Sequence, residues 1–254
     1  MQVDFGRTSE DYARYRAGFP VSLFERLANH GVGLSGQQIL DLGTGTGTLA
    51  RGFAQRGCQV TGLDVAAEQL AQADELDRQA GVRVMYRVAP AENTGLADAS
   101  FDVVTAGQCW HWLDRPRAAD EVNRLLRPGG TLVIAHYDWL PLPDNVVELT
   151  EELLLRYNPA WRFGGGTGIY PQWFRDVAVA SFVQIESFTY DEPAIYSHAA
   201  WRGRLRASAP IGGSLPAEDV VRFDADLAAA LASQFPEEPL AVPHRVFALL
   251  CQRI

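Results

Sequence analysis

The chain has 254 residues, of which 47% are hydrophobic and 21% are charged, an ordinary balance for a globular protein. This length suffices for one large domain or for a domain that carries a sizeable insertion. The net charge of −9 disfavours long-range attraction to nucleic-acid phosphates and to anionic membranes, so we expect neither as a partner.

The cysteines and the first residues of the chain carry little signal. The chain has an odd number of cysteines, namely Cys58, Cys109 and Cys251, and no two of them show CxxC spacing. We therefore expect neither a disulfide framework nor a metal site. Residues 1–20 are polar, and no apolar run approaches the roughly 20 residues that span a bilayer. The expected location is the cytoplasm.

In chain order, the first half alternates between helices and strands. Residues 9–30 have a roughly helical spacing of apolar side chains that is broken at Pro20. A strand is expected at 39–42, where apolar residues precede a glycine-rich turn. The remaining predictions for this half are a helix at 46–56, a strand at 59–63, a helix at 67–79, strands at 82–88 and 101–106, a helix at 114–126, a turn at 127–130 and a strand at 131–135.

The second half has a different pattern. Its predicted elements are helices at 144–157, 197–207 and 216–234 and strands at 182–190 and 242–251, while 158–173 has no clear period.

Together the two halves predict an α/β fold with a Rossmann-like, doubly wound sheet, mostly parallel with an antiparallel C-terminal strand. We expect one domain over 1–254 with a cofactor-binding core at 37–136. The segments 1–35, 137–180 and 193–240 would form a helical and aromatic cap on the substrate side, over the carboxyl ends of the strands.

The turn after the first strand is the most informative motif. It reads D-x-G-x-G-x-G, with Asp41 followed by Gly43, Gly45 and Gly47. Glycine permits positive φ and a close approach of a ligand to the backbone. A dinucleotide fingerprint needs a third glycine where this chain has Thr48, and an acid in the turn would repel a pyrophosphate. The motif therefore favours a ligand with an ammonium group and no phosphate, such as S-adenosylmethionine.

Further candidate contacts to an adenosine follow the next strands. Asp64 ends the second strand, where an acid can accept two hydrogen bonds from a ribose diol. Val65 could pack on an adenine face. Ala91 and Glu92 follow the third strand, where polar groups could meet the adenine amino group, and Gln108 follows the fourth strand.

These motifs resemble the class I S-adenosylmethionine-dependent methyltransferases in order and spacing. The matching segments are 41–47, Asp64, 91–92, 101–104 and 125–130, which cover about residues 37–136. The segments 12–20 and 108–112 resemble a small-molecule subgroup similar to trans-aconitate methyltransferase. The resemblance implies an opening helix that covers the cofactor, with Tyr15 and Arg16 near its carboxylate. The chain departs from the pattern at Pro90, where relatives often carry an acid.

Methyl transfer needs a base only when the nucleophile holds a proton of high pKa. His111, which follows the fourth strand between two tryptophans, is the best candidate for a catalytic base, and His136 is weaker. Arg202, which shares a helical face with Arg206, could hold an anionic acceptor, and a solvated helix face is the alternative reading. Aromatic side chains could line the acceptor site or simply pack the cap; the candidates are Trp110, Tyr137, Trp139, Tyr170 and Trp173.

The sequence leaves the methyl acceptor open. It predicts a small organic molecule with an oxygen, nitrogen or carbon nucleophile, and it does not indicate an oligomeric state. An RNA acceptor is disfavoured by the acidic charge. Two alternatives remain, an NAD-dependent oxidoreductase on a Rossmann fold and a non-catalytic protein that binds S-adenosylmethionine.

Overall fold

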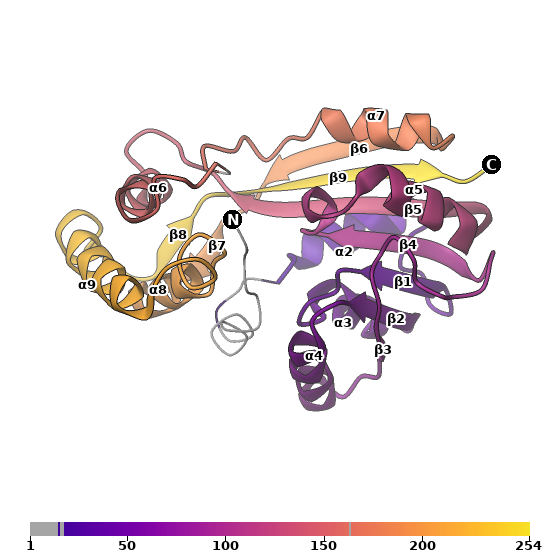
Figure 1. Ribbon diagram of the computed structural model, residues 1–254, viewed down its shortest axis with the longest axis horizontal. Coiled ribbons are helices and arrows are strands. Elements are labelled where there is room, and N and C mark those ends of the chain that lie inside the picture. Colours follow the sequence, from indigo (N-terminus) through magenta and orange to yellow (C-terminus); the bar gives the residue numbers. More distant parts are fainter. Residues whose placement is uncertain (1–14, 16–17, 163) are drawn as a thin grey trace. The chain divides into compact units, whose positions relative to one another are not determined.

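The computed structural model describes residue 15, residues 18–162 and residues 164–254. The chain forms two compact units (Figure 1). The sheet unit comprises residues 18–137, 169–190 and 246–254, and the helical unit comprises Tyr15 with residues 138–168 and 191–245.

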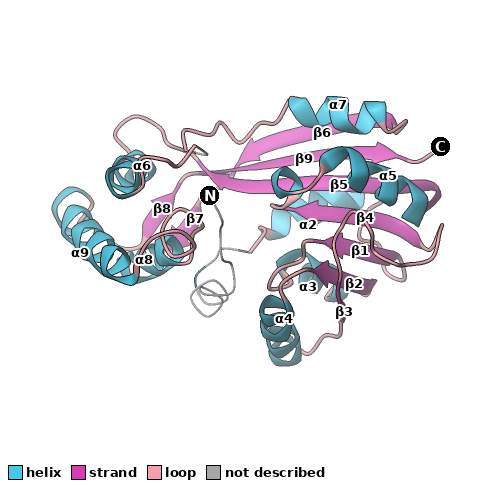
Figure 2. Cartoon of the chain, in the orientation of Figure 1, coloured by secondary structure: helices cyan, strands magenta, loops and turns pink. Residues whose placement is uncertain are grey.

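The sheet unit is built on seven strands in the order β3-β2-β1-β4-β5-β9-β6 (Figure 2). Strand β1 pairs in parallel with β2 on one side and with β4 on the other, so the order of connection reverses between β1 and β4. In open α/β sheets ligands bind outside the carboxyl ends of the strands at this reversal. The strands are β1 (Gln38–Leu42), β2 (Gln59–Asp64), β3 (Met85–Val88), β4 (Phe101–Gly107), β5 (Leu126–Trp139), β6 (Val183–Asp191) and β9 (His244–Gln252).

The predicted fold class is confirmed, since the sheet is mostly parallel with antiparallel C-terminal strands. Four consecutive residues of β1, 39–42, are buried, as expected for a strand that is covered on both faces. Asp41 is the one charged residue among them. The strand that precedes the glycine turn is therefore held rigidly in the middle of the core.

Helices cover the sheet through apolar faces. α3 packs against β1 and β2, α4 packs against β2 and β3, and α5 packs against α7. In α2 the buried face includes Phe24, whose ring lies 5.1 Å from that of Phe53 and occupies the space that a Cβ at Gly52 would need. The elements are α2 (Val21–Asn29), α3 (Thr48–Ala54), α4 (Ala67–Ala80), α5 (Arg115–Leu125), α7 (Gln172–Val179) and the 3-10 turn η2 (Trp110–Trp112).

The helical unit holds α6 (Val146–Tyr157), α8 (His198–Arg206) and α9 (Ala217–Gln234). It also holds a two-stranded antiparallel sheet of β7 (Ala194–Tyr196) and β8 (Leu240–Val242). α9 packs on α6 and α8, and the buried Trp201 of α8 donates its indole N–H to Thr150 of α6 at 3.0 Å. In the part of the chain that the structure describes, no helix is both long and apolar enough to cross a bilayer.

Some predicted boundaries were wrong. The strand expected at 82–88 begins only at Met85, and the turn expected at 127–130 belongs to β5. Backbone pairing explains the second difference, because the Gly129 N–H donates to Arg253 and the Arg253 N–H donates to Gly130, both at 2.9 Å. The first helical piece of 9–30 lies outside the described residues, apart from Tyr15.

Four short elements escaped prediction, namely η2, α7, β7 and β8. The segment 137–180, expected on the substrate side, is divided between the two units, and α7 belongs to the sheet unit. The assignment of cofactor and substrate roles to segments of the chain stays a prediction.

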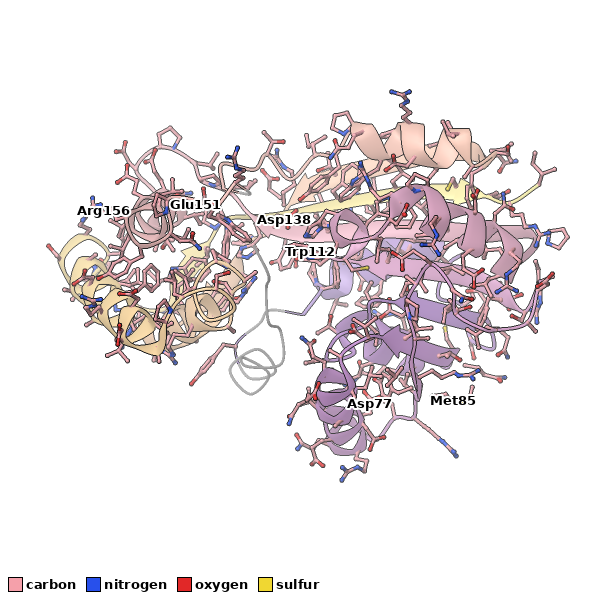
Figure 3. All side chains as sticks on the ribbon, in the orientation of Figure 1. Asp77, Met85, Trp112, Asp138, Glu151 and Arg156 are labelled. Carbon is pink, nitrogen blue, oxygen red and sulfur yellow. The ribbon has the colours of Figure 1, made fainter. Side chains whose placement is uncertain are left out.

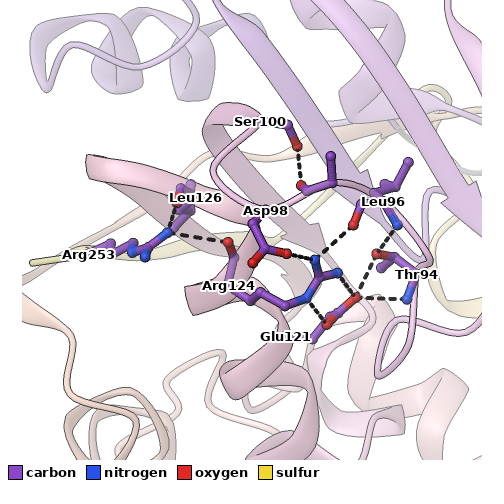
Figure 4. A network of polar contacts seen from close by, with 9 residues as sticks. Thr94, Leu96, Asp98, Ser100, Glu121, Arg124, Leu126 and Arg253 are labelled. Carbon is purple, nitrogen blue, oxygen red and sulfur yellow. Dashed lines mark hydrogen bonds and ion pairs between the residues drawn. The ribbon is translucent and has the colours of Figure 1, made fainter.

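A network of ion pairs and hydrogen bonds joins the loop after Glu92 to α5 (Figure 4). We call its members Thr94, Asp98, Glu121 and Arg124 the clasp. Glu121 accepts hydrogen bonds from the N–H and the hydroxyl of Thr94, at 2.9 and 2.7 Å, and pairs with Arg124 at 2.7 Å. Arg124 also pairs with Asp98 and donates to the carbonyl of Leu96 at 2.8 Å. The hydrogen bonds from Arg124 are the main cause that lowers the pKa of Glu121 to about 2.

The clasp generates a prediction about stability. Glu121→Gln should lower the free energy of unfolding at pH 7 by about 1–3 kcal/mol, because a charge-assisted pair is lost. The lowered pKa of Glu121 means that this contribution is present above pH 4.5 and is lost as pH falls toward 2. Urea unfolding of both proteins at pH 7 and near pH 3 should show the difference shrinking at low pH.

The control for this prediction is Arg78→Ala, which removes an exposed pair on α4 and should cost less than about 0.5 kcal/mol. A difference between wild type and Glu121→Gln that is the same at both pH values would contradict the role given to the ionised carboxylate.

Candidate functional site

The glycine loop, residues 43–47, follows β1 and leads into α3. Its glycines have φ values of +56°, +55° and +77° at positions 43, 45 and 47. A Cβ at Gly43 would lie 2.7 Å from Cys109 Cβ, and one at Gly47 would lie 2.5 Å from the Tyr86 hydroxyl. The chain's own backbone and packing therefore require glycine at these two positions. Close approach of a ligand, the reason given by the sequence, stays a prediction.

Asp41 is the chemical centre of the site. Its side chain is buried at the end of β1, where one carboxylate oxygen accepts the hydroxyl of Thr44 and the other that of Thr105, each at 2.6 Å. Burial is the main cause that raises the pKa of Asp41 to about 6, and the negative charge of Asp64 adds to it. None of the described residues places a cationic side chain in an ion pair with this carboxylate.

The uncompensated charge has an energetic cost. In the unfolded chain the carboxyl ionises near its usual pKa of 3.8, whereas in the folded chain it ionises near 6. Stability is therefore lost as pH rises from about 4 to 6, and a shift of this size corresponds to about 3 kcal/mol at neutral pH. A bound cation would offset this cost.

Asp64 connects the glycine loop to the next helix. One of its oxygens accepts the N–H of Gly45 at 2.8 Å, and the other accepts the N–H of Ala66 at 2.9 Å. A carboxylate has about four acceptor positions, so both oxygens can accept further hydrogen bonds. Val65, the next residue, is 70% exposed and has its side chain available for packing on a ligand.

The other strand-end candidates have roles within the protein. Ala91 is buried, and Glu92 accepts the N–H of Asp114 at 2.9 Å, next to the start of α5. Gln108 follows β4 with a φ of +58°, which is unfavourable for a side chain larger than glycine. Its amide donates to the carbonyl of Tyr137, so it joins the ends of β4 and β5. Strain of this kind is often found at functional sites.

An aromatic cluster lies after β4 and within β5. The ring of His111 is 4.7 Å from that of Trp112 and 5.3 Å from that of His136. His136 is itself 4.6 Å from the ring of Tyr170 and 4.8 Å from that of Trp173. The structure thus brings together both histidines and two predicted substrate residues.

Within this cluster Tyr170 and Trp173 stack at 3.8 Å, with an angle of 3° between their rings. The Trp173 side chain is fully buried, and its indole N–H has no hydrogen-bond partner among the described residues. An unsatisfied buried donor is costly, so a polar ligand atom that reached it would be favoured.

Two further substrate candidates pack in the core. Trp110 is fully buried, and its indole N–H donates to Asp176 at 3.3 Å. Asp176 is also paired with Arg115 at 3.3 Å. The Tyr137 side chain is 7% exposed. Burial gives both residues a structural role, and a contact with substrate stays a prediction for each.

The remaining candidates belong to the helical unit or lie outside the described residues. Trp139 donates to Glu151 at 2.9 Å. Arg202 and Arg206 share the carboxylate of Asp224, so Arg202 already has an anionic partner. The ring of Tyr15 lies against Gly203, and Arg16 is not among the described residues.

Sequence reasoning missed the hydroxyls that hold Asp41. Thr44 lies within the glycine motif and could have been suspected, whereas Thr105 lies 64 residues away and is brought to Asp41 only by the pairing of β1 with β4. The described residues contain no group of three His, Cys, Asp or Glu side chains that could hold a metal ion.

Comparisons with known proteins agree with this geometry. The family described as Methyltransferase domain matches residues 40–134. The malonyl-[acyl-carrier protein] O-methyltransferase of Pectobacterium atrosepticum is 39% identical over 132 residues, which are 52% of this chain and 50% of that protein. The chain thus spans about half the length of the curated relatives that it matches.

Two solved structures extend the likeness to the whole fold. A putative type II methyltransferase from Anaeromyxobacter dehalogenans is 26% identical with a TM-score of 0.60, covering 94% of this chain and 97% of that one. The phosphoethanolamine N-methyltransferase 2 of Haemonchus contortus was solved with phosphomonomethylethanolamine and S-adenosylhomocysteine. It is 20% identical with a TM-score of 0.58, covering 96% of this chain and 56% of that one, and shows the fold alone.

The sheet order, the glycine loop with its flanking acids and these relatives lead to one assignment. Residues 40–134 match the methyltransferase-domain family, and the fold of the chain is the Rossmann-like fold of the class I S-adenosylmethionine-dependent methyltransferases.

Proposed function

We propose that this chain binds S-adenosylmethionine and transfers its methyl group to an oxygen, nitrogen or carbon nucleophile of a small organic molecule. One observation carries the proposal. Asp41 is a buried carboxylate beside the glycine loop with no cationic partner among the described residues, and Asp64 adds a second negative charge to its surroundings. A cationic ligand that lacks phosphate is the chemical complement of such a site.

The residues at the strand ends fit this cofactor. Asp41 would balance its positive charge, and Asp64 would accept hydrogen bonds from the ribose diol while holding Gly45 in place. Val65 is exposed and would pack on the adenine. The remaining proposed cofactor contacts are the backbone of Gly43 and Gly47 and the residues Tyr15, Arg16, Ala91, Glu92 and Gln108.

The bound cofactor supplies an activated methyl group, and its departing portion is neutral and needs no acid. The chain's contribution is then to align the acceptor and to exclude water, which can supply roughly 7–11 kcal/mol. His111 would take the proton of a hydroxyl or amine acceptor. The partly buried Tyr170 would wall the acceptor, and Trp173, which stacks on its ring, would hold that ring in place and remains a candidate for contact with the acceptor. Trp110, Tyr137, Trp139 and Arg202 remain candidates for contact with the acceptor.

The alternative function, an oxidoreductase with a nicotinamide cofactor, fits the glycine loop less well. A pyrophosphate in the glycine loop would lie beside the Asp41 carboxylate, and the described residues offer no cation there to reduce the repulsion. A nucleic-acid acceptor is disfavoured by the net charge of −9. We propose the cytoplasm as the location and no membrane partner.

The first prediction from this proposed function concerns the binding of S-adenosylmethionine. Calorimetry should detect S-adenosylmethionine binding to the wild type, and Asp64→Asn should weaken it at least about tenfold, because one charged acceptor for the ribose is lost. Asp74→Asn, on the exposed face of α4, is the matched control and should bind as the wild type does. A folded wild type without affinity, or full affinity in Asp64→Asn, would refute the proposed site.

The second prediction concerns His111. In a screen of phenols, alcohols, amines and carboxylates for transfer of a labelled methyl group, His111→Ala should lower kcat on a hydroxyl acceptor by about 10²-fold or more. The affinity for the cofactor should not change, and His30→Ala should behave as the wild type. Equal turnover by His111→Ala on a hydroxyl acceptor would exclude His111 as the base. Cofactor binding without turnover on any acceptor would favour a non-catalytic binding protein.

A further inference from the structure

Asp77 lies on α4 with only 3% of its side chain exposed, although it carries no function assigned so far (Figure 3). Two side chains account for its burial. Arg51 of α3 approaches one carboxylate oxygen at 2.7 Å, and the hydroxyl of Tyr86 on β3 donates to the other at 2.7 Å. Burial is the main cause that raises the pKa of Asp77. We call these three residues the loop-support triad.

Arg51 connects the triad directly to the glycine loop. One terminal nitrogen of its guanidinium donates to the carbonyl of Thr46 at 2.8 Å and to that of Ala73 on α4 at 3.3 Å. Thr46 lies between the second and third glycines of the loop. The backbone orientation at this point is therefore held by a side chain that is itself fixed by Asp77.

Tyr86 supports the same loop through its shape. Its hydroxyl oxygen lies where it would be 2.5 Å from a Cβ at Gly47, and its ring lies where it would be 2.6 Å from a Cβ at Gly62 of β2. Both glycines leave room for one tyrosine side chain. Gly62 lies in the middle of a strand, where glycine usually lowers stability. The close packing of the Tyr86 ring explains why a glycine is present at this position.

Stability alone is a weak explanation for the triad. A buried ion pair often contributes little net stability, because the cost of removing both charges from water is large. Arg51 and Asp77 are 16% and 3% exposed and bear this cost. Their position behind the loop, with a hydrogen bond to Thr46 and a close contact at Gly47, is specific to the loop geometry.

We infer that Arg51, Asp77 and Tyr86 are positioning residues that hold the glycine loop in its ligand-binding shape without touching the ligand. This inference rests on the proposed function, since the ligand in question is the S-adenosyl cofactor. The inference says that part of the affinity for the cofactor depends on residues that lie outside the glycine motif and on three different elements.

The test uses Tyr86→Phe and Arg51→Lys, with Tyr190→Phe as the matched control. Tyr190 lies on β6, the edge strand opposite β3, and its hydroxyl is 2.7 Å from that of Ser22. Tyr86→Phe removes only the hydroxyl. Arg51→Lys keeps a positive charge near Asp77 but lacks the planar guanidinium that pairs with Asp77 through one nitrogen and donates to Thr46 through another.

Two quantities are measured on the full chain. Amide hydrogen exchange without ligand should become about three- to tenfold faster at residues 44–48 in Tyr86→Phe and Arg51→Lys, while the amides of β4 keep their wild-type rates. Calorimetry with S-adenosylhomocysteine should show affinity reduced by a similar factor of about three to ten. Tyr190→Phe should change neither quantity.

The outcomes separate this inference from the proposed function. Wild-type exchange at 44–48 and wild-type affinity in both variants would overturn the inference while leaving the proposed function intact. Faster exchange throughout the sheet unit would make the triad a general structural element and would also overturn it. A wild type that binds no cofactor would refute the proposed function, and the exchange rates would still show whether the triad holds the loop.

Discussion

The buried charge of Asp41 is the constraint on which the rest of the site depends. A carboxylate enclosed at the end of β1 is unfavourable, and the pKa of about 6 expresses that cost. The chain offsets part of it with two hydroxyls, from Thr44 and Thr105, and supplies no cation from the described residues. In the function that we propose, a cationic ligand completes the site electrostatically, which connects the fold directly to the choice of ligand.

The geometry around this charge is produced by pairing glycines with large side chains. Gly43 makes room for Cys109, Gly47 and Gly62 make room for Tyr86, and Gly52 makes room for Phe24. Each pair joins the loop, or an element beside it, to a neighbouring strand, helix or strand end. The loop is consequently a packed part of the core with a defined backbone, which reduces the ordering cost of binding.

Much of the sheet could be predicted because its signals are local. Short apolar strands alternate with helices, and the acid within 39–42 and the glycines after it mark the strand end at the proposed site. α7 was missed because its eight residues bury only Trp173 and Val177, too few to show a helical period. The prediction of a turn at 127–130 was wrong because the backbone of this segment pairs with Arg253, which lies at the far end of the chain.

The candidate site residues also divide into those that local sequence signals could place and those that depend on tertiary pairing. Asp41 and Asp64 lie at the ends of β1 and β2, and His111 follows β4, so topology alone brings them to one edge of the sheet. Arg202 could be placed on a helical face from its spacing, but its partner Asp224 lies on another helix and could not be foreseen. Tertiary pairing of this kind also produced the loop-support triad, whose three members come from α3, α4 and β3.

Proton release on cofactor binding tests the central claim most directly. Because a cationic ligand would lower the pKa of Asp41 from about 6, binding of S-adenosylmethionine at pH 6 should release about half a proton from this group. Calorimetry in buffers of different ionisation enthalpy measures the release, which should vanish at pH 8 and be absent from Asp41→Asn. Binding at pH 6 without proton release, or with the same release from Asp41→Asn, would contradict the account.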